Sequence, residues 1–115
     1  MQTDSTTLVF RALADPTRRR ILQAIADRPA HVAQLTRHFP VSRPAISKHL
    51  GVLKNAGLVS FSEQGKKRLY RMEPGPLRLA DRWLDHYRRF WEESLQRLKE
   101  HMEASSPMTR KRRGK

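Results

Sequence analysis

The stretch VSRPAISKHLGVLKNAGLV, residues 41–59, decides how the rest of the sequence is interpreted. It contains three lysine or arginine residues and no acidic residue. Placed at about 100° per residue, as in an α-helix, its side chains separate into two sides. The apolar side consists of Ala45, Ile46, Leu50, Val52, Leu53 and Ala56. The polar, basic side consists of Arg43, Pro44, Ser47, Lys48, Gly51, Lys54 and Asn55.

The ends of this helix are also marked in the sequence. Ser42 suits the N-cap, and Pro44 is tolerated in the first turn because its missing N–H has no intrahelical partner there. Gly57 occupies the position of a left-handed C-cap. The stretch therefore predicts a helix that packs on a core with one side and exposes the other, basic side.

Three further helices are predicted before it. The first runs over about Asp4–Ala14. Asp15 is a suitable N-cap for the second, Pro16 suits its first position, and Arg28-Pro29 ends it. A short third helix over Val32–Phe39 stops at a proline, which leaves a tight connection before Ser42.

The segments after residue 59 predict a hairpin and a long helix. Val59–Met72 reads as two β-prone runs around the polar, glycine-containing centre Glu63–Lys66. Pro74-Gly75-Pro76 interrupts the chain, and a helix follows over about Leu77–Met102. Together these elements predict a mostly α-helical fold with a β-hairpin wing, a winged helix-turn-helix with a long C-terminal helix. We expect one domain over residues 1–104 and a disordered basic tail over residues 105–115.

Charge and composition limit the possible partners. The chain has 24 Lys+Arg against 11 Asp+Glu, a formal net charge of +13. Residues 41–71 hold seven basic residues and one acidic residue, whereas residues 72–104 hold six basic and seven acidic residues. A basic middle segment is typical of chains that bind nucleic acid, and a surface that merely aids solubility is the alternative. With no cysteine in the chain, disulfides, thiolate metal sites and thiol catalysis are excluded.

Neither a signal peptide nor a membrane span is predicted. The segment MQTDSTTLVFRALA lacks an apolar core of signal-peptide length, and no apolar run approaches the roughly 20 residues of a membrane span. A cytoplasmic location is therefore expected.

Three motifs together resemble the ArsR/SmtB family of bacterial repressors. They are FRALADPTRRRIL at 10–22, SRPAISKHLGVLKNAGLV at 42–59 and GKKRLYRM at 65–72. The sequence WLDHYRRFWEESLQRL at 83–98 is similar to the metal-free, SdpR-like branch of that family. The resemblance covers about Phe10 to Met102. It implies a homodimeric winged-helix repressor that pairs through its first and last helices.

The candidate DNA-binding residues follow from the basic side of the central helix and from the wing. Arg43, Pro44, Ser47 and Lys48 lie nearest the N-terminal end of that side and are predicted to reach base edges in the major groove, with Lys54 further along it. Contact with phosphates alone is the alternative for each of them. Contacts with the DNA backbone are predicted for Thr36 and Arg37 in the preceding helix. The resemblance implies that the wing residues Lys66, Lys67 and Arg68 meet phosphates or an adjacent minor groove, and a solvated hairpin tip is the alternative. His49 falls within the apolar side and is expected to pack.

The wide apolar side of the helix expected over about Leu77–Met102 predicts a second packing partner. Its apolar residues cover roughly 160° of the helix surface, more than the ~100° that one core requires. The resemblance implies that a second copy of the chain supplies the partner. The candidate dimerisation residues are Leu8, Val9, Trp83, Tyr87, Phe90, Trp91, Leu95 and Leu98. A small-molecule pocket among the aromatic residues is the alternative.

The sequence argues against metal sensing. The thiolate positions that the resemblance implies fall near His31 and Ala33, and neither is cysteine. The family's other site needs Asp-x-His followed by His-x-x-Glu or His-x-x-His. Here Asp85 and His86 are adjacent, and His101 has no paired ligand. No metal and no other cofactor is therefore expected.

Two DNA-binding functions remain after these exclusions. The first is sequence-specific repression, in which a dimer occupies an inverted-repeat operator in double-stranded DNA and excludes polymerase from a promoter. The second is architectural DNA binding with low sequence specificity. A module whose winged helix binds protein is disfavoured by the acid-free basic side. No nucleophile–base pair, phosphate loop or paired-carboxylate site can be assembled, so an enzyme is not predicted.

Overall fold

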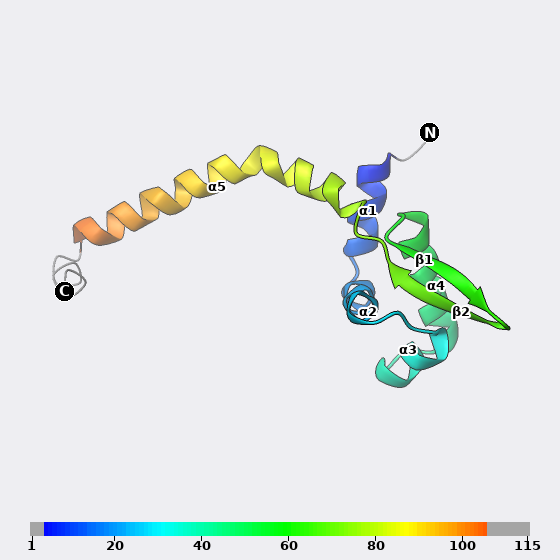
Figure 1. The fold of residues 1–115 in the computed structure, drawn as a ribbon. Coiled ribbons are helices and arrows are strands. Elements are labelled where there is room, and N and C mark those ends of the chain that lie inside the picture. Colours follow the sequence, from blue (N-terminus) through cyan, green and yellow to red (C-terminus); the bar gives the residue numbers. More distant parts are fainter. Residues whose placement is uncertain (1–3, 106–115) are drawn as a thin grey trace. The chain divides into compact units, whose positions relative to one another are not determined.

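A computed structural model describes residues 4–105 of the chain, and five helices and one antiparallel hairpin form within them (Figure 1). The elements are α1 (Ser5–Leu13), α2 (Pro16–Asp27), α3 (Val32–His38), α4 (Arg43–Asn55), β1 (Val59–Gln64), β2 (Lys67–Met72) and α5 (Leu77–Ser105). The predicted winged helix-turn-helix is confirmed, with α3 and α4 as the two helices of the motif and the hairpin as the wing. None of the described helices has the length and apolarity needed to cross a membrane.

Short polar side chains start three of the helices. The carboxylate of Asp4 accepts the N–H of Thr7 at 2.7 Å, and that of Asp15 accepts the N–H of Arg18 at 3.0 Å. The hydroxyl of Ser42 accepts the N–H of Ala45 at 3.2 Å, so the predicted caps at Asp15 and Ser42 are both confirmed. The N–H of Arg18 lowers the pKa of Asp15 because it stabilises the ionised carboxylate. The contribution of this cap to stability is therefore fully present above the pKa that Asp15 has in the unfolded chain. It is lost as the pH falls through the lower pKa of Asp15 in the folded chain.

The chain forms two compact units, and the boundary between them lies inside α5, after Asp81. The buried core belongs to the first unit and draws on all four preceding helices and the hairpin. Helix α4 contributes Ile46, Leu50 and Leu53, each of them fully buried. The predicted apolar side of this helix is thus confirmed as the side that packs.

Val9 belongs to this core and offers no surface to a second chain. Its side chain is 0% exposed, whereas the neighbouring Leu8 is half-buried. The prediction that placed Val9 in a dimer contact is therefore corrected, because α1 uses Val9 to pack within its own chain. Helical periodicity places both residues on one side of α1, but it cannot say which chain covers them.

A left-handed glycine ends α4 and directs the chain into the wing. Gly57 has φ +77° and donates its N–H to Lys54 O at 2.8 Å, while the N–H of Leu58 reaches Leu53 O at 2.9 Å. This pair of bonds is the Schellman arrangement, which confirms the predicted cap. Leu58, the next residue, is fully buried, so the turn also fixes where the hairpin begins.

The two strands of the hairpin meet in a two-residue turn. The predicted turn was a four-residue centre, but Glu63 pairs with Arg68 and Gln64 pairs with Lys67, which leaves only Gly65-Lys66 between the strands. Gly65 has φ +64°, the conformation that such a tight turn needs. Ala30 and Tyr70 exchange two backbone hydrogen bonds, of 3.0 and 2.9 Å, so β2 is also bonded to the segment before α3.

Helices α3 and α5 end at residues other than the predicted ones. Helix α3 stops at His38, and Phe39 is its C-cap. Helix α5 continues three residues beyond Met102 because Glu103 and Ala104 are compatible with a helix. The hydroxyl of Ser105 donates to His101 O at 2.9 Å within the last turn, so Ser105 is helical and does not belong to the predicted tail. The rest of that tail, 106–115, lies outside the described residues.

The guanidinium of Arg18 joins three helices. Its Nε donates to Ala12 O at 2.8 Å and its Nη2 donates to Arg11 O at 2.9 Å, so it completes the C-terminal end of α1. Its Nη1 lies 3.5 Å from Nδ1 of His49 in α4. His49 is half-buried there, as expected for a residue that packs. This junction fixes α4 against α1 and α2.

Candidate nucleic-acid interface

The exposed side of α4 is the side that the sequence predicted. Its seven polar or small residues are all exposed, and the helix contains no acidic residue. They are Arg43, Pro44, Ser47, Lys48, Gly51, Lys54 and Asn55. A Cβ added to Gly51 would meet no atom of the chain within 4 Å, so nothing in the fold of the described residues requires a glycine at this position.

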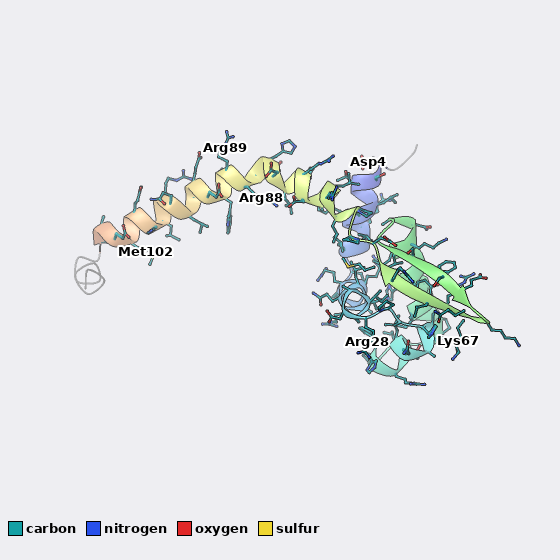
Figure 2. The ribbon with its side chains drawn as sticks, viewed as in Figure 1. Asp4, Arg28, Lys67, Arg88, Arg89 and Met102 are labelled. Atoms are coloured by element: carbon teal, nitrogen blue, oxygen red, sulfur yellow. The ribbon has the colours of Figure 1, made fainter. Side chains whose placement is uncertain are left out.

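A basic groove lies between the start of α3, the start of α4 and the hairpin. Arg43 and Ser47 line it from α4, and the hairpin contributes a run of three cations. Figure 2 labels one of these cations, Lys67, on the hairpin beside the helices. The groove is lined by His31, Val32, Ala33, Arg43, Ser47, Lys66, Lys67, Arg68 and Tyr70. The fold thus brings five of the predicted DNA-binding residues to one place.

The other predicted residues lie outside this groove. Pro44 and Lys48 are exposed on the same side of α4. The hydroxyl of Thr36 donates to Val32 O at 2.9 Å inside α3, so its hydrogen is already engaged, while Arg37 is exposed. Lys54 lies near the end of α4, where its Nζ is 5.3 Å from the centre of the Phe61 ring.

Two residues that contact Arg68, His31 and Phe61, were not identified from the sequence as part of this region. The Nδ1 of His31 lies 3.0 Å from Arg68 O and donates to it, because a carbonyl can only accept. The guanidinium carbon of Arg68 lies 4.3 Å from the centre of the Phe61 ring. The strand register could have indicated the second contact, because it places both residues on one face of the hairpin. Nothing in the sequence pattern marks the first.

The chemistry of this surface fits a polyanion. The groove combines arginine and lysine donors from two elements, and Glu63 is the sole acidic residue among residues 41–71. Arginine presents planar N–H donors that suit both phosphate oxygens and a guanine edge, whereas lysine presents a compact charge. In residues 4–105 no three His, Cys, Asp or Glu side chains gather in a way that could hold a metal ion.

A long apolar surface occupies one side of α5 in the second unit. Its large side chains are about half exposed or more, with Phe90 at 64% and Trp91 at 63%. Met102 belongs to this side, and Arg89 leaves α5 on the opposite side (Figure 2). The surface consists of Trp83, Leu84, Tyr87, Phe90, Trp91, Leu95, Leu98 and Met102. An exposed apolar stripe this long is typical of an interaction surface.

Comparison with known proteins identifies the relatives of this chain. The family model described as "Bacterial regulatory protein, arsR family" matches residues 15–60, which run from the cap of α2 into β1. The HTH-type transcriptional regulator Rv2034 of Mycobacterium tuberculosis is 45% identical over 86 residues, which are 75% of this chain and 78% of that protein. The transcriptional repressor SdpR of Bacillus subtilis is 34% identical over 76 residues, which are 66% of this chain and 84% of that protein.

A solved structure shares the fold. The ArsR-like transcriptional regulator from Rhodococcus sp. RHA1 is 33% identical and superposes with a TM-score of 0.70, over 87% of this chain and 92% of that one. The family model covers the helix-turn-helix and reaches the first strand of the wing, and the resemblance stated from the sequence motifs is confirmed. By these relationships the chain belongs to the ArsR family of bacterial transcriptional regulators, with a winged helix-turn-helix fold.

Proposed function

We propose that this chain is a homodimeric repressor that binds an inverted-repeat operator in double-stranded DNA and blocks access to a promoter. Helix α4 reads base edges in the major groove, and the hairpin contacts the adjoining phosphates. Two copies pair through α1 and the apolar side of α5. A regulator of this kind acts where the chromosome lies, so the proposal places it in the cytoplasm.

One observation carries the proposal: the acid-free, exposed side of α4 is continuous with the groove that the wing cations line. Arg43 and Ser47 belong to both surfaces. Basic residues on the wing alone would support only nonspecific attraction to phosphate. A rigid helix that presents arginine, serine and lysine between those cations supplies groups of the kind that distinguish base pairs.

Selection of bound duplexes from a random DNA library tests the function. At about 150 mM salt the expected product is an inverted repeat whose half-sites lie about 34–36 Å apart or a multiple of that distance. The selected operator should bind at least ~10³-fold more tightly than a scrambled duplex. If no sequence is enriched and binding disappears as salt rises, the chain is an architectural DNA binder instead.

The proposal includes no metal effector. Two supports are the lack of cysteine in the whole chain and the lack of a cluster of metal-binding side chains within residues 4–105. We expect the affinity for the selected operator to change less than about twofold when a chelator, Zn²⁺ or Cd²⁺ is added, because residues 4–105 hold no cluster of metal-binding side chains that could couple the ion to α4. Titration of labelled operator under these conditions measures the effect. A shift of tenfold or more with either ion would contradict metal-free regulation.

Gly51 offers a test that separates DNA contact from folding. Gly51→Ala should raise the free energy of unfolding by about 0.5–1 kcal/mol, because alanine is the better helix former and open space surrounds its Cβ. The same change should weaken operator binding several-fold if the backbone of α4 closely approaches DNA at this point. Urea unfolding and operator titration measure the two effects. Unchanged operator affinity would show that DNA does not closely approach α4 at Gly51.

A further inference from the structure

The ring of Phe61 in β1 lies against two cations that belong to different elements. The guanidinium carbon of Arg68 is 4.3 Å from the ring centre, and Nζ of Lys54 is 5.3 Å from it. Both distances fall within the ~6 Å over which a ring attracts a cation. We propose that Phe61 is a positioning residue for DNA binding, which holds the Arg68 guanidinium ready to contact a DNA phosphate.

The register of the hairpin explains why these side chains meet. Phe61 is paired with Tyr70, and their ring centres are 5.4 Å apart. Arg68 precedes Tyr70 by two residues, so it extends from the same face of β2 and is the diagonal neighbour of Phe61. Tyr70 is buried and Phe61 half-buried, which identifies this face as the inner one. Arg68 therefore extends along the inner face into the groove that also contains Arg43.

The main chain at Arg68 is anchored independently of its side chain. His31 donates Nδ1–H to Arg68 O at 3.0 Å, and Tyr70, two residues later, is bonded in both directions to Ala30. The backbone of β2 is thus attached to the segment before α3 at the point where Arg68 leaves it. With the backbone anchored and the guanidinium resting on Phe61, both ends of this side chain have defined positions.

This arrangement orders Arg68 without occupying its hydrogen-bond donors. A guanidinium that stacks on a ring uses its face, and its five N–H donors lie in the plane and stay available. Arg68 remains exposed, so a phosphate oxygen can reach those donors. A free arginine would lose rotamer freedom when it bound a phosphate, and an arginine already held on Phe61 loses less. Phe61 therefore contributes to affinity without touching DNA.

This inference rests on the proposed function and deepens it, so its test uses the whole 115-residue chain and the selected operator. Phe61→Leu keeps an apolar side chain but removes the ring, and Phe61→Tyr keeps the ring. We expect Phe61→Leu to weaken operator binding by about fivefold, the change that corresponds to about 1 kcal/mol of cation–ring attraction. Phe61→Tyr should stay within about twofold of the unaltered chain.

A double-mutant cycle with Arg68→Gln separates positioning from packing. If Phe61 acts through Arg68, adding Phe61→Leu to Arg68→Gln should lower operator affinity by less than about twofold. The small loss that remains reflects the contact of Phe61 with Lys54 alone. Arg68→Gln should also make the plot of log affinity against log salt concentration shallower, with a slope smaller in magnitude by about one, as expected when one phosphate contact is lost. Thermal unfolding of each variant accompanies the titrations, so that loss of fold is recognised.

Three results would overturn the inference. Operator affinity unchanged or increased in Phe61→Leu would mean that the ring does not help Arg68 to reach phosphate. An equal loss from Phe61→Leu with and without Arg68→Gln would mean that Phe61 acts by packing. Failure of the unaltered chain to prefer any operator would overturn the proposed function as well. That last result appears before any Phe61 variant is compared, so the two failures are distinguishable.

Discussion

Replacement of Arg43 by alanine is expected to weaken binding to the selected operator by at least about tenfold and to leave the fold and the oligomeric state unchanged. Arg43 is the first residue of α4, where a recognition helix enters the major groove. Its side chain is exposed and lines the groove shared with Arg68. Within residues 4–105 it has no hydrogen bond or ion pair to lose, so its removal should cost little stability.

The measurement is a titration of operator and scrambled duplexes with Arg43→Ala and with Arg71→Ala. Arg71 is an exposed residue of β2 next to Tyr70, so it lies on the opposite, outer face of the hairpin. Both variants lose one positive charge, and only Arg43→Ala should lower the preference for the operator. An equal loss of affinity for both duplexes would mean that Arg43 contacts phosphate alone. Unaltered binding in Arg43→Ala would refute the assignment of α4 as the recognition helix.

The features that sequence predicted well depend on neighbours within a turn or two of helix. The caps at Asp15 and Ser42 and the Schellman turn at Gly57 each involve residues no more than five positions apart. The two sides of α4 also follow from local periodicity, and burial of Ile46 and Leu50 confirms them. Local signals of this kind predicted the order of the helices, the wing and most of the basic surface.

The features that were missed depend on residues far apart in the chain. The guanidinium of Arg18 donates to the end of α1 and lies beside His49, 31 residues away. The contact between His31 and Arg68 spans 37 positions. No periodic pattern encodes such pairs. The same limit explains the error at Val9, because an apolar stripe gives no information about which chain covers it.

A single charge on the apolar side of α5 is the second change from which we expect a large effect. Trp91→Glu should weaken dimer formation by at least about 100-fold, because large aromatic residues dominate interfaces and a carboxylate cannot be buried there without a partner. The Trp91 side chain is 63% exposed, between Tyr87 and Leu95 on the same apolar side of the helix. Since the exposed side chain supports no core of its own chain, the variant should fold.

Gln96→Glu is the matched control for this change. It also adds one negative charge to α5, but it lies five residues from Trp91, a rotation of about 140° around the helix axis, outside the apolar side. Sedimentation equilibrium should show a monomer for Trp91→Glu at micromolar concentration and a dimer for Gln96→Glu.

The proposed function links this change to DNA affinity. A monomer presents one recognition helix, so it loses the gain in effective concentration that binding the second half-site provides, and Trp91→Glu should bind the inverted repeat at least about 100-fold more weakly. Binding to a single half-site should be unaffected, because α4 and the wing are unaltered. A variant that stays dimeric would show that the apolar side of α5 does not form the dimer contact. A monomeric variant with full operator affinity would show instead that one copy of the chain suffices for recognition.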